Sequence, residues 1–205
     1  MRKLLALLFL LVSGAASADE SISVCYNYSC TDEATAWFSE PQLRTLAKKL
    51  RSTRSAAEER KALSDVIGQL YYWAGQQTPV YADKGGNVAD GAVNGAMDCI
   101  DHSTTTTRFL KMLESRRLLR YHEVENVVRR RRFFLFEHFS AVIEELPHPM
   151  LGKPGDDDGI LDFWDEVKPH RYVVDSWFVN NGKPAVILPL EDWMNGAGPN
   201  VESSR

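Results

Sequence analysis

The chain has 205 residues, of which 44% are hydrophobic and 10% aromatic, enough to build one domain around a proper core. Its formal net charge is −4, with 24 Lys and Arg against 28 Asp and Glu. This acidic balance argues against nucleic acid or an anionic membrane as the main partner, because both are bound through basic surfaces.

The first eighteen residues read as a signal peptide. Arg2 and Lys3 precede an apolar run, and Ala16-Ser17-Ala18 matches an A-x-A cleavage site. The apolar run is too short to cross a bilayer, and no later stretch approaches about 20 apolar residues, so we expect no membrane span. Cleavage removes two basic residues and leaves 22 against 28 acidic ones, a net charge of about −6. We therefore expect a periplasmic or secreted protein with one mature domain, residues 19–205.

Residues 31–74 are expected to be helical. Two apolar stripes recur there at helical spacing: Leu43, Leu46, Ala47 and Leu50, then Leu63, Val66, Ile67, Leu70, Tyr71 and Ala74. Pro41 is predicted to open the first helix, and Ser55 or Thr53 to cap the second.

Between residues 75 and 95 this periodicity disappears. The stretch contains five glycines and one proline, and a loop this long inside a domain is usually functional. A helix is predicted next, over 99–117. Asp98 is its expected N-cap, and Asp101 is the acidic partner of a capping box.

The second half of the chain is strand-like. Four segments carry the pattern: YHEVENVV, RRFFLFEHFSAVIEE, RYVVDSWFV and PAVILPLEDW. NNGKP, between the last two, predicts a hairpin turn. The four arginines at 129–132 fit a solvated strand edge or loop, and the three aspartates at 156–158 fit a solvated acidic loop within 147–170. Helices followed by an antiparallel sheet predict an α+β fold, with the central helix packed on the sheet.

The chain has three cysteines, which is informative in an oxidising compartment. Cys25 and Cys30 are close in sequence and are expected to form the one disulfide. Cys99 is then an odd thiol at a helix start, where free N–H groups and the helix dipole favour the thiolate. A reactive rather than an inert thiol is the favoured interpretation.

A reactive thiol needs a base, and His138 is the best candidate of five histidines because it interrupts an apolar strand. Asp175 interrupts another such strand. If the two strands are neighbours, Asp175 would orient His138. His102 reads as a residue flanking Cys99 on its own helix. His122, His148 and His170 read as solvated.

Three motifs in this order, MDCIDHSTTTTRFLKML, EHFSAVIEE and YVVDSWF, resemble those of the bacterial transglutaminase-like cysteine proteinases. The resemblance covers roughly residues 75–193. It implies a papain-like α+β fold, with Cys99 as nucleophile, His138 as base and Asp175 as orienter. The helical N-terminal third carries no matching motif.

An acyl-transfer site also needs an oxyanion hole. The backbone N–H of Cys99 can supply one donor. A side-chain amide from the preceding loop could supply the second, with Asn94 or Gln77 favoured over Gln76.

The leading hypothesis is a cysteine hydrolase, or an amine transferase with the same acyl-enzyme, acting on an amide in a peptide, a protein or peptidoglycan. No cofactor is expected. The alternative is a binding module that keeps the fold without turnover. A zinc site built from Cys99, His102, His138 and Asp175 is weakly supported by spacing, and residues 156–158 do not fit a calcium loop, so no metal is expected.

Overall fold

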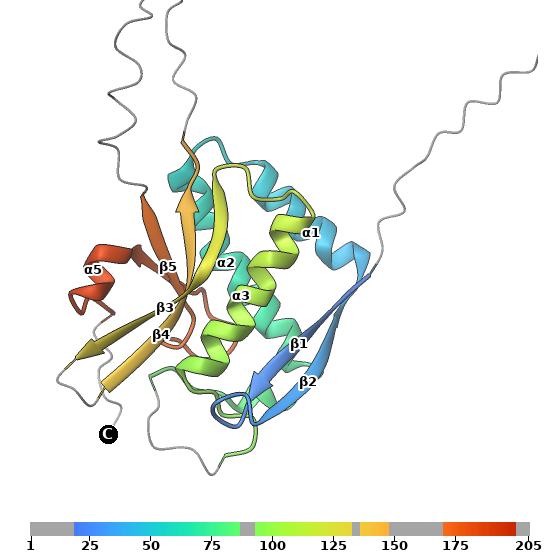
Figure 1. Ribbon diagram of the computed structural model, residues 1–205. Helices are drawn as coiled ribbons and strands as arrows, with labels where there is room; N and C mark the ends of the chain where they lie inside the picture. Colours follow the sequence, from blue (N-terminus) through green and yellow to red (C-terminus); the bar gives the residue numbers. More distant parts are fainter. Residues whose placement is uncertain (1–18, 87–92, 133–135, 148–169, 200–205) are drawn as a thin grey trace, which may run out of the picture.

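The computed structural model describes residues 19–86, 93–132, 136–147 and 170–199, and within them the chain is α+β (Figure 1). The predicted signal peptide, the aspartates at 156–158 and His148 lie outside these ranges. The described elements are, in chain order, β1 (Glu20–Tyr26), β2 (Asp32–Phe38), α1 (Glu40–Arg51), α2 (Ala56–Gly75), the 3-10 turn η1 (Pro79–Ala82), α3 (Cys99–Ser115), β3 (His122–Arg132), β4 (Phe136–Glu145), β5 (Arg171–Asp175), β6 (Val186–Pro189) and α5 (Leu190–Met194).

The strands form two antiparallel sheets. β1 and β2 make a two-stranded ribbon, and the other four strands pair in the order β3-β4-β5-β6. Helices and antiparallel sheets are therefore segregated along the chain, which confirms the α+β prediction.

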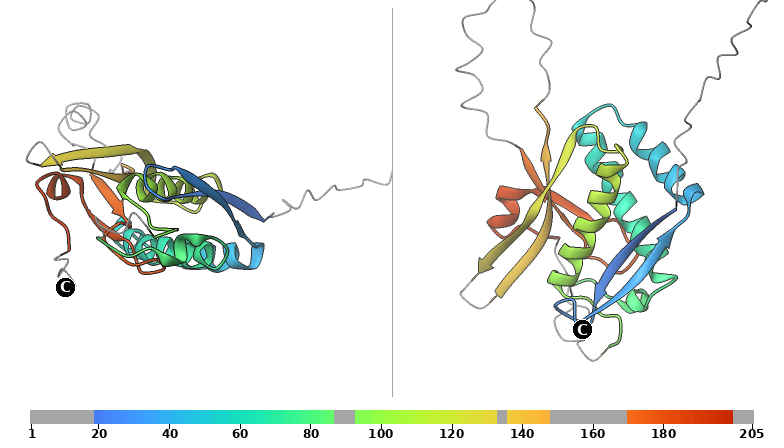
Figure 2. Two further views of the ribbon diagram at one scale, coloured as in Figure 1. Left: turned by 90° about the horizontal axis from the view of Figure 1, so that it is seen from below. Right: turned by 45° about the vertical axis from the view of Figure 1, so that its right-hand side comes forward.

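Helix α3 is the central element. It packs against β3 and β4 on one side, against β1 on the other, and against α2. Figures 1 and 2 show the four-stranded sheet and the β1–β2 ribbon on opposite flanks of α3. The central helix thus lies on the sheet as expected. Its N-terminal end lies near the β3–β4 hairpin.

The main core is built on the apolar face of α3. Phe109 is fully buried, and its ring meets the rings of Phe38 and Tyr71 edge to face, with centroids 5.7 and 5.1 Å apart. One aromatic side chain therefore joins α3 to both β2 and α2. The opposite face of the large sheet carries a second, smaller cluster in which Val142 and Val173 pack against Trp193 of α5.

We expect Phe109→Ala to lower the free energy of unfolding by about 3–5 kcal/mol, because it removes a buried ring and leaves a cavity between three elements. Urea unfolding followed by circular dichroism measures this. Trp37 on β2 is 61% exposed, so Trp37→Ala is the control and should cost well under half as much. Equal losses for the two variants would contradict this assignment of the core.

The N-terminal third is only partly helical, which corrects the prediction for residues 31–38. This segment is the strand β2, in register with β1. Ala36 and Phe38 are buried while Thr35 and Trp37 are exposed, so the burial has the period of a strand. The helical prediction is right from residue 40. Pro41 lies in the first turn of α1, and Ser55 caps α2 by accepting the N–H of Glu58.

The C-terminal strands are shorter than predicted. β5 ends at Asp175, and the turn predicted at NNGKP lies within a ten-residue connection, 176–185, where the Lys183 N–H donates to the Asn180 carbonyl at 3.0 Å. β5 and β6 are nonetheless antiparallel neighbours. PAVILPLEDW is a strand only over 186–189, because Pro189 caps the short helix α5. Arg131 and Arg132, predicted to begin the next strand, belong to β3.

Candidate active site

Cys99 is the first residue of α3, and the sequence caps this helix as predicted. The Asp98 side chain accepts the N–H groups of Ile100 and Asp101, both at 2.9 Å, and Asp101 accepts the N–H of Asp98 at 3.1 Å. Within the described ranges the Cys99 N–H has no acceptor on another residue, and it lowers the pKa of its own thiol. It therefore remains available at the positive end of the helix.

The carboxylates that flank Cys99 are held by a left-handed loop. Residues 27–30 all have positive φ, between 51° and 66°, although none is glycine. Their N–H groups converge on two side chains: Tyr28 and Cys30 donate to Asp101 at 2.8 and 2.6 Å, and Ser29 donates to Asp98 at 3.0 Å. Successive N–H groups of this kind form an anion-binding nest.

The predicted disulfide between Cys25 and Cys30 is present and closes this loop, so that prediction is confirmed. Cys99 is the free thiol of the chain. The backbone of residues 27–30 is unfavourable for side chains other than glycine. The disulfide and the bonds to Asp98 and Asp101 together hold it in place.

The Cys99 thiol lies against the segment of β4 that carries His138. Its Sγ atom is 4.0 Å from the carbonyl oxygen of Glu137. β4 pairs with β5 only as far as Ala141, so this segment extends beyond the pairing and its edge is open. The thiol occupies that edge.

The surroundings of Cys99 oppose ionisation of an isolated thiol. Burial raises the pKa of Cys99, and the charges of Asp98 and Asp175 raise it further. The backbone N–H groups of Phe139 and of Cys99 itself act in the opposite direction and lower this pKa. Burial also raises the pKa of Asp101, to about 6. The thiol therefore needs a nearby proton acceptor to react near neutral pH.

His138 and Asp175 form a hydrogen-bonded pair across β4 and β5. His138 Nε2 is 2.7 Å from Asp175 Oδ2. Asp175 is 2% exposed and accepts two further bonds, from Trp193 Nε1 at 2.9 Å and from the Trp177 N–H at 3.2 Å. Three hydrogen bonds to one buried carboxylate fix its orientation.

Aromatic rings surround the imidazole. The ring centroids of Trp177, Phe178 and Trp193 lie 4.8, 5.4 and 5.5 Å from that of His138. Ring faces attract a cation and exclude water, so they can stabilise an imidazolium. Among the described residues, Nδ1 of His138 has no hydrogen-bond partner, and Cys99 makes no hydrogen bond to the ring.

The two predicted oxyanion donors are placed differently. Gln77 donates to the carbonyls of Trp37 and Trp73, at 2.9 and 3.0 Å, so both its amide hydrogens are used between β2 and α2. Asn94 is exposed, and its Oδ1 accepts a bond from Asn27 at 3.1 Å. The Asn94 amide nitrogen has no partner in the described part of the chain, so of the two only Asn94 has an available donor.

The histidines other than His138 depart in part from expectation. His170 is exposed, as expected for a solvated residue. His122 is buried and hydrogen-bonded to Glu59 at 2.9 Å, so the prediction that it is solvated was wrong.

His102 is also buried, and it hydrogen-bonds to Asp83 and Ser176 at 3.0 and 2.8 Å. The sequence did not predict that Asp83 and Ser176 are the partners of His102. The helical stripe His102, Thr106, Phe109 was a signal that His102 faces the core.

The donor set considered for zinc is not assembled. Both ring nitrogens of His102 are engaged by Asp83 and Ser176, and His138 is paired with Asp175. Within the described ranges, the one convergent group of metal-ligating residue types is Cys25, Cys30 and Asp101, whose two sulfurs are joined in the disulfide.

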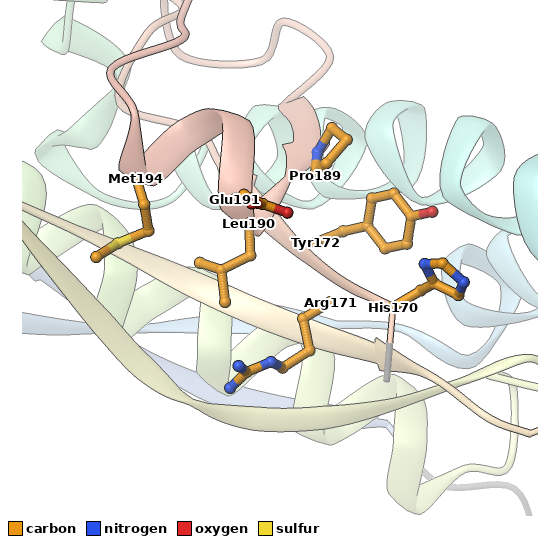
Figure 3. Close-up of a pocket in the computed structure, with 7 residues that line it drawn as sticks. All are labelled: His170, Arg171, Tyr172, Pro189, Leu190, Glu191 and Met194. Atoms are coloured by element: carbon orange, nitrogen blue, oxygen red, sulfur yellow. The ribbon is translucent and has the colours of Figure 1, made fainter. Parts of the chain in front are cut away.

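A cavity of about 510 Å³ opens at the other end of β5 (Figure 3). It is lined by residues 170–172 and 189–191 and by Met194. Arg171 and Asp175 are four residues apart, or ~13 Å along a strand. This cavity therefore contains none of the candidate catalytic side chains.

Comparison with protein-family models, curated proteins and solved structures gives no match for the chain. Within the described residues, no helix has both the length and the apolar character that crossing a bilayer requires.

Proposed function

We propose that the protein is an exported cysteine hydrolase that opens an amide bond through a Cys99 acyl-enzyme. One observation carries the proposal. The thiol of Cys99, at the start of α3, lies against the part of β4 that carries His138. His138 is hydrogen-bonded to the buried carboxylate of Asp175. Nucleophile, base and orienting group are the parts that covalent acyl transfer requires.

In the proposed mechanism, the Cys99 thiol gives its proton to His138 as the sulfur attacks the carbonyl carbon. Asp175 stabilises the imidazolium, and the Cys99 N–H donates to the oxyanion, with Asn94 as the candidate second donor. His138 then protonates the leaving amine. Water attacks the thioester, with His138 again taking its proton, and the acid is released.

The electrostatics favour proton transfer during the attack. Since burial and two carboxylates raise the pKa of the thiol, Cys99 depends on His138 to react near neutral pH. The resting thiol is thereby protected in an oxidising compartment, where a free thiolate is readily oxidised. The Cys25–Cys30 disulfide is consistent with such a compartment, the periplasm or the exterior.

The substrate class we propose is an amide within a peptide, a protein or peptidoglycan. Attack by an amine in place of water would make the same site a transferase, since the acyl-enzyme is shared. The resemblance to transglutaminase-like cysteine proteinases, found on three motifs of the sequence, supports both reactions equally.

The experiment is acylation of the purified protein by p-nitrophenyl acetate, a generic acyl donor, followed by intact mass and peptide mapping. We expect one acetyl group, on Cys99, with a burst of nitrophenolate equal to the protein concentration. Cys99→Ala is the control and should show no burst. A wild-type protein without acetylated Cys99, and with no more nitrophenolate than Cys99→Ala releases, would overturn the proposal.

The alternative is a binding module without turnover. Two observations favour it: the raised pKa of Cys99, and the lack of a hydrogen bond between its thiol and His138 among the described residues. In that case Cys99 would remain unacetylated in the folded protein and would react only after unfolding.

A further inference from the structure

A chain of buried polar side chains runs beside the candidate active site. Asp83 Oδ2 lies 3.0 Å from His102 Nε2, and His102 Nδ1 lies 2.8 Å from Ser176 Oγ. Ser176 is 2.9 Å from Thr106 Oγ1, which is 3.0 Å from the hydroxyl of Tyr71. All five residues are at most 3% exposed.

One arrangement of protons satisfies this chain. Asp83 accepts at both oxygens, from the Met97 N–H at 2.9 Å and from His102 Nε2–H. His102 Nδ1 then accepts a hydrogen bond from the Ser176 hydroxyl. Ser176 in turn accepts from Thr106. In this arrangement the imidazole bridges a carboxylate and a hydroxyl, and both of its ring nitrogens have a partner.

Stability alone does not explain why five polar side chains are buried together here. A paired polar group in the interior is seldom more stable than well-packed apolar side chains of the same volume, whereas it does specify a single arrangement of the segments that it joins.

Two of the segments joined here carry parts of the proposed machinery, the start of α3 with Cys99 and the end of β5 with Asp175. Met97, bonded to Asp83, is two residues before Cys99, and His102 follows Cys99 by three on the same helix. Ser176 is the residue after Asp175. This series of hydrogen bonds therefore links the residues on both sides of Cys99 to the end of β5.

We infer that Asp83, His102 and Ser176 are positioning residues that fix Cys99 relative to the His138–Asp175 pair. The inference rests on the proposed function, since it assigns these residues a role in the same reaction. None of them reaches the reacting atoms. They act through Met97, α3 and Asp175.

The chain offers a matched control in a second buried carboxylate–imidazole pair. Glu59 is fully buried and accepts from His122 Nδ1 at 2.9 Å and from the backbone N–H groups of Arg120 and Tyr121. His122 pairs with Glu145, which is seven residues from His138 along β4, or ~23 Å. This pair is equally buried and lies far from Cys99.

The test compares His102→Gln and Ser176→Ala with His122→Gln. Iodoacetamide labelling of Cys99, the free thiol, is followed by intact mass near pH 7 and pH 10, together with the thermal midpoint. The charged groups that act on the thiol are Asp98, which precedes it at the start of α3, and Asp175 from β5, and the proposed base is His138 from β4.

Near pH 7, we expect labelling to fall about tenfold in His102→Gln and about threefold in Ser176→Ala, because a shift of about 1 Å uncouples the thiol from its base. Near pH 10 the thiolate forms without the imidazole, so all rates should agree within about twofold. His122→Gln should lower the thermal midpoint without changing either rate.

Folded His102→Gln and Ser176→Ala variants that keep the wild-type rate near pH 7 would overturn the inference. So would an equal loss at both pH values or the same loss in His122→Gln. If His102→Gln does not fold, Ser176→Ala decides. Failure of the proposed function is distinguishable, because the wild-type rate near pH 7 would then equal that of His138→Ala.

Discussion

His138→Ala is expected to slow iodoacetamide labelling of Cys99 near pH 7 by roughly a hundredfold, the range of a lost general base. Near pH 10 the variant and the wild type should differ by less than about twofold, because the thiolate then forms without help. The assay needs no substrate. It also follows a single thiol, since Cys25 and Cys30 are joined in the disulfide.

The sign of the effect follows from the environment of the thiol. Burial, Asp98 and Asp175 all raise the pKa of Cys99. Without the imidazole, the thiol therefore stays protonated up to higher pH than an ordinary cysteine, and labelling is confined to alkaline solution. With His138 in place, the imidazole can accept the thiol proton, so labelling should already be measurable near pH 7.

His170→Ala is the control for this prediction, because His170 is exposed and adjoins the separate cavity at the start of β5. It should label as the wild type does at every pH. Asp175→Asn should lie between the wild type and His138→Ala, since it keeps the side-chain shape but weakens the stabilisation of the imidazolium. Equal labelling of the wild type and His138→Ala near pH 7 would contradict the pairing of thiol and imidazole.

The parts of the site that depend on local sequence were predictable. The capping box of Asp98 and Asp101 is a short-range pattern, and it places Cys99 at a helix start whatever the rest of the chain does. The disulfide was predictable because two cysteines five residues apart, in a chain whose first residues predict export, leave few alternatives.

Pairing between distant segments could be predicted only on a condition, that the strands of His138 and Asp175 are neighbours. The proximity of His138 and Asp175 follows from the register that places Ala141 opposite Val174, which the spacing of the two residues cannot determine. Asp83 lies in a loop without periodicity, and only the folded chain brings it to His102.

Residues 32–38 show how strand pairing can override the local preference for a helix. The segment follows the disulfide loop and is rich in alanine, which favours a helix. Its pairing with β1 and the burial of Phe38 against Phe109 make it a strand. The signal available in the sequence is the alternation of Ala34, Ala36 and Phe38 with the polar Glu33 and Thr35.

Replacing both disulfide cysteines, Cys25→Ser with Cys30→Ser, is expected to have the second large effect. The free energy of unfolding should fall by about 2 kcal/mol, the loop-closure contribution of a crosslink this short. Labelling of Cys99 near pH 7 should also fall, by about tenfold, because the start of α3 loses the loop that holds it. Urea unfolding and the iodoacetamide assay measure the two effects separately.

The second effect follows from the backbone of residues 27–30. Without the crosslink, side chains such as Tyr28 and Ser29 have no reason to stay at positive φ, at a cost of roughly 1 kcal/mol or more for each residue. As the loop relaxes, Asp98 and Asp101 lose three N–H donors. The charge of Asp98, which already raises the pKa of the thiol, is then less compensated, and the start of α3 is no longer fixed relative to β4.

Two further variants separate this mechanism from a general loss of stability. Ser55→Ala removes the cap of α2 and should cost about 1 kcal/mol while leaving labelling unchanged. Adding Ser29→Gly to the double serine variant should recover part of the labelling rate, because glycine adopts positive φ freely and keeps the N–H that Asp98 accepts. A double serine variant that labels like the wild type near pH 7 would show that the helix cap alone is enough to hold Cys99, and that the loop contributes only to stability.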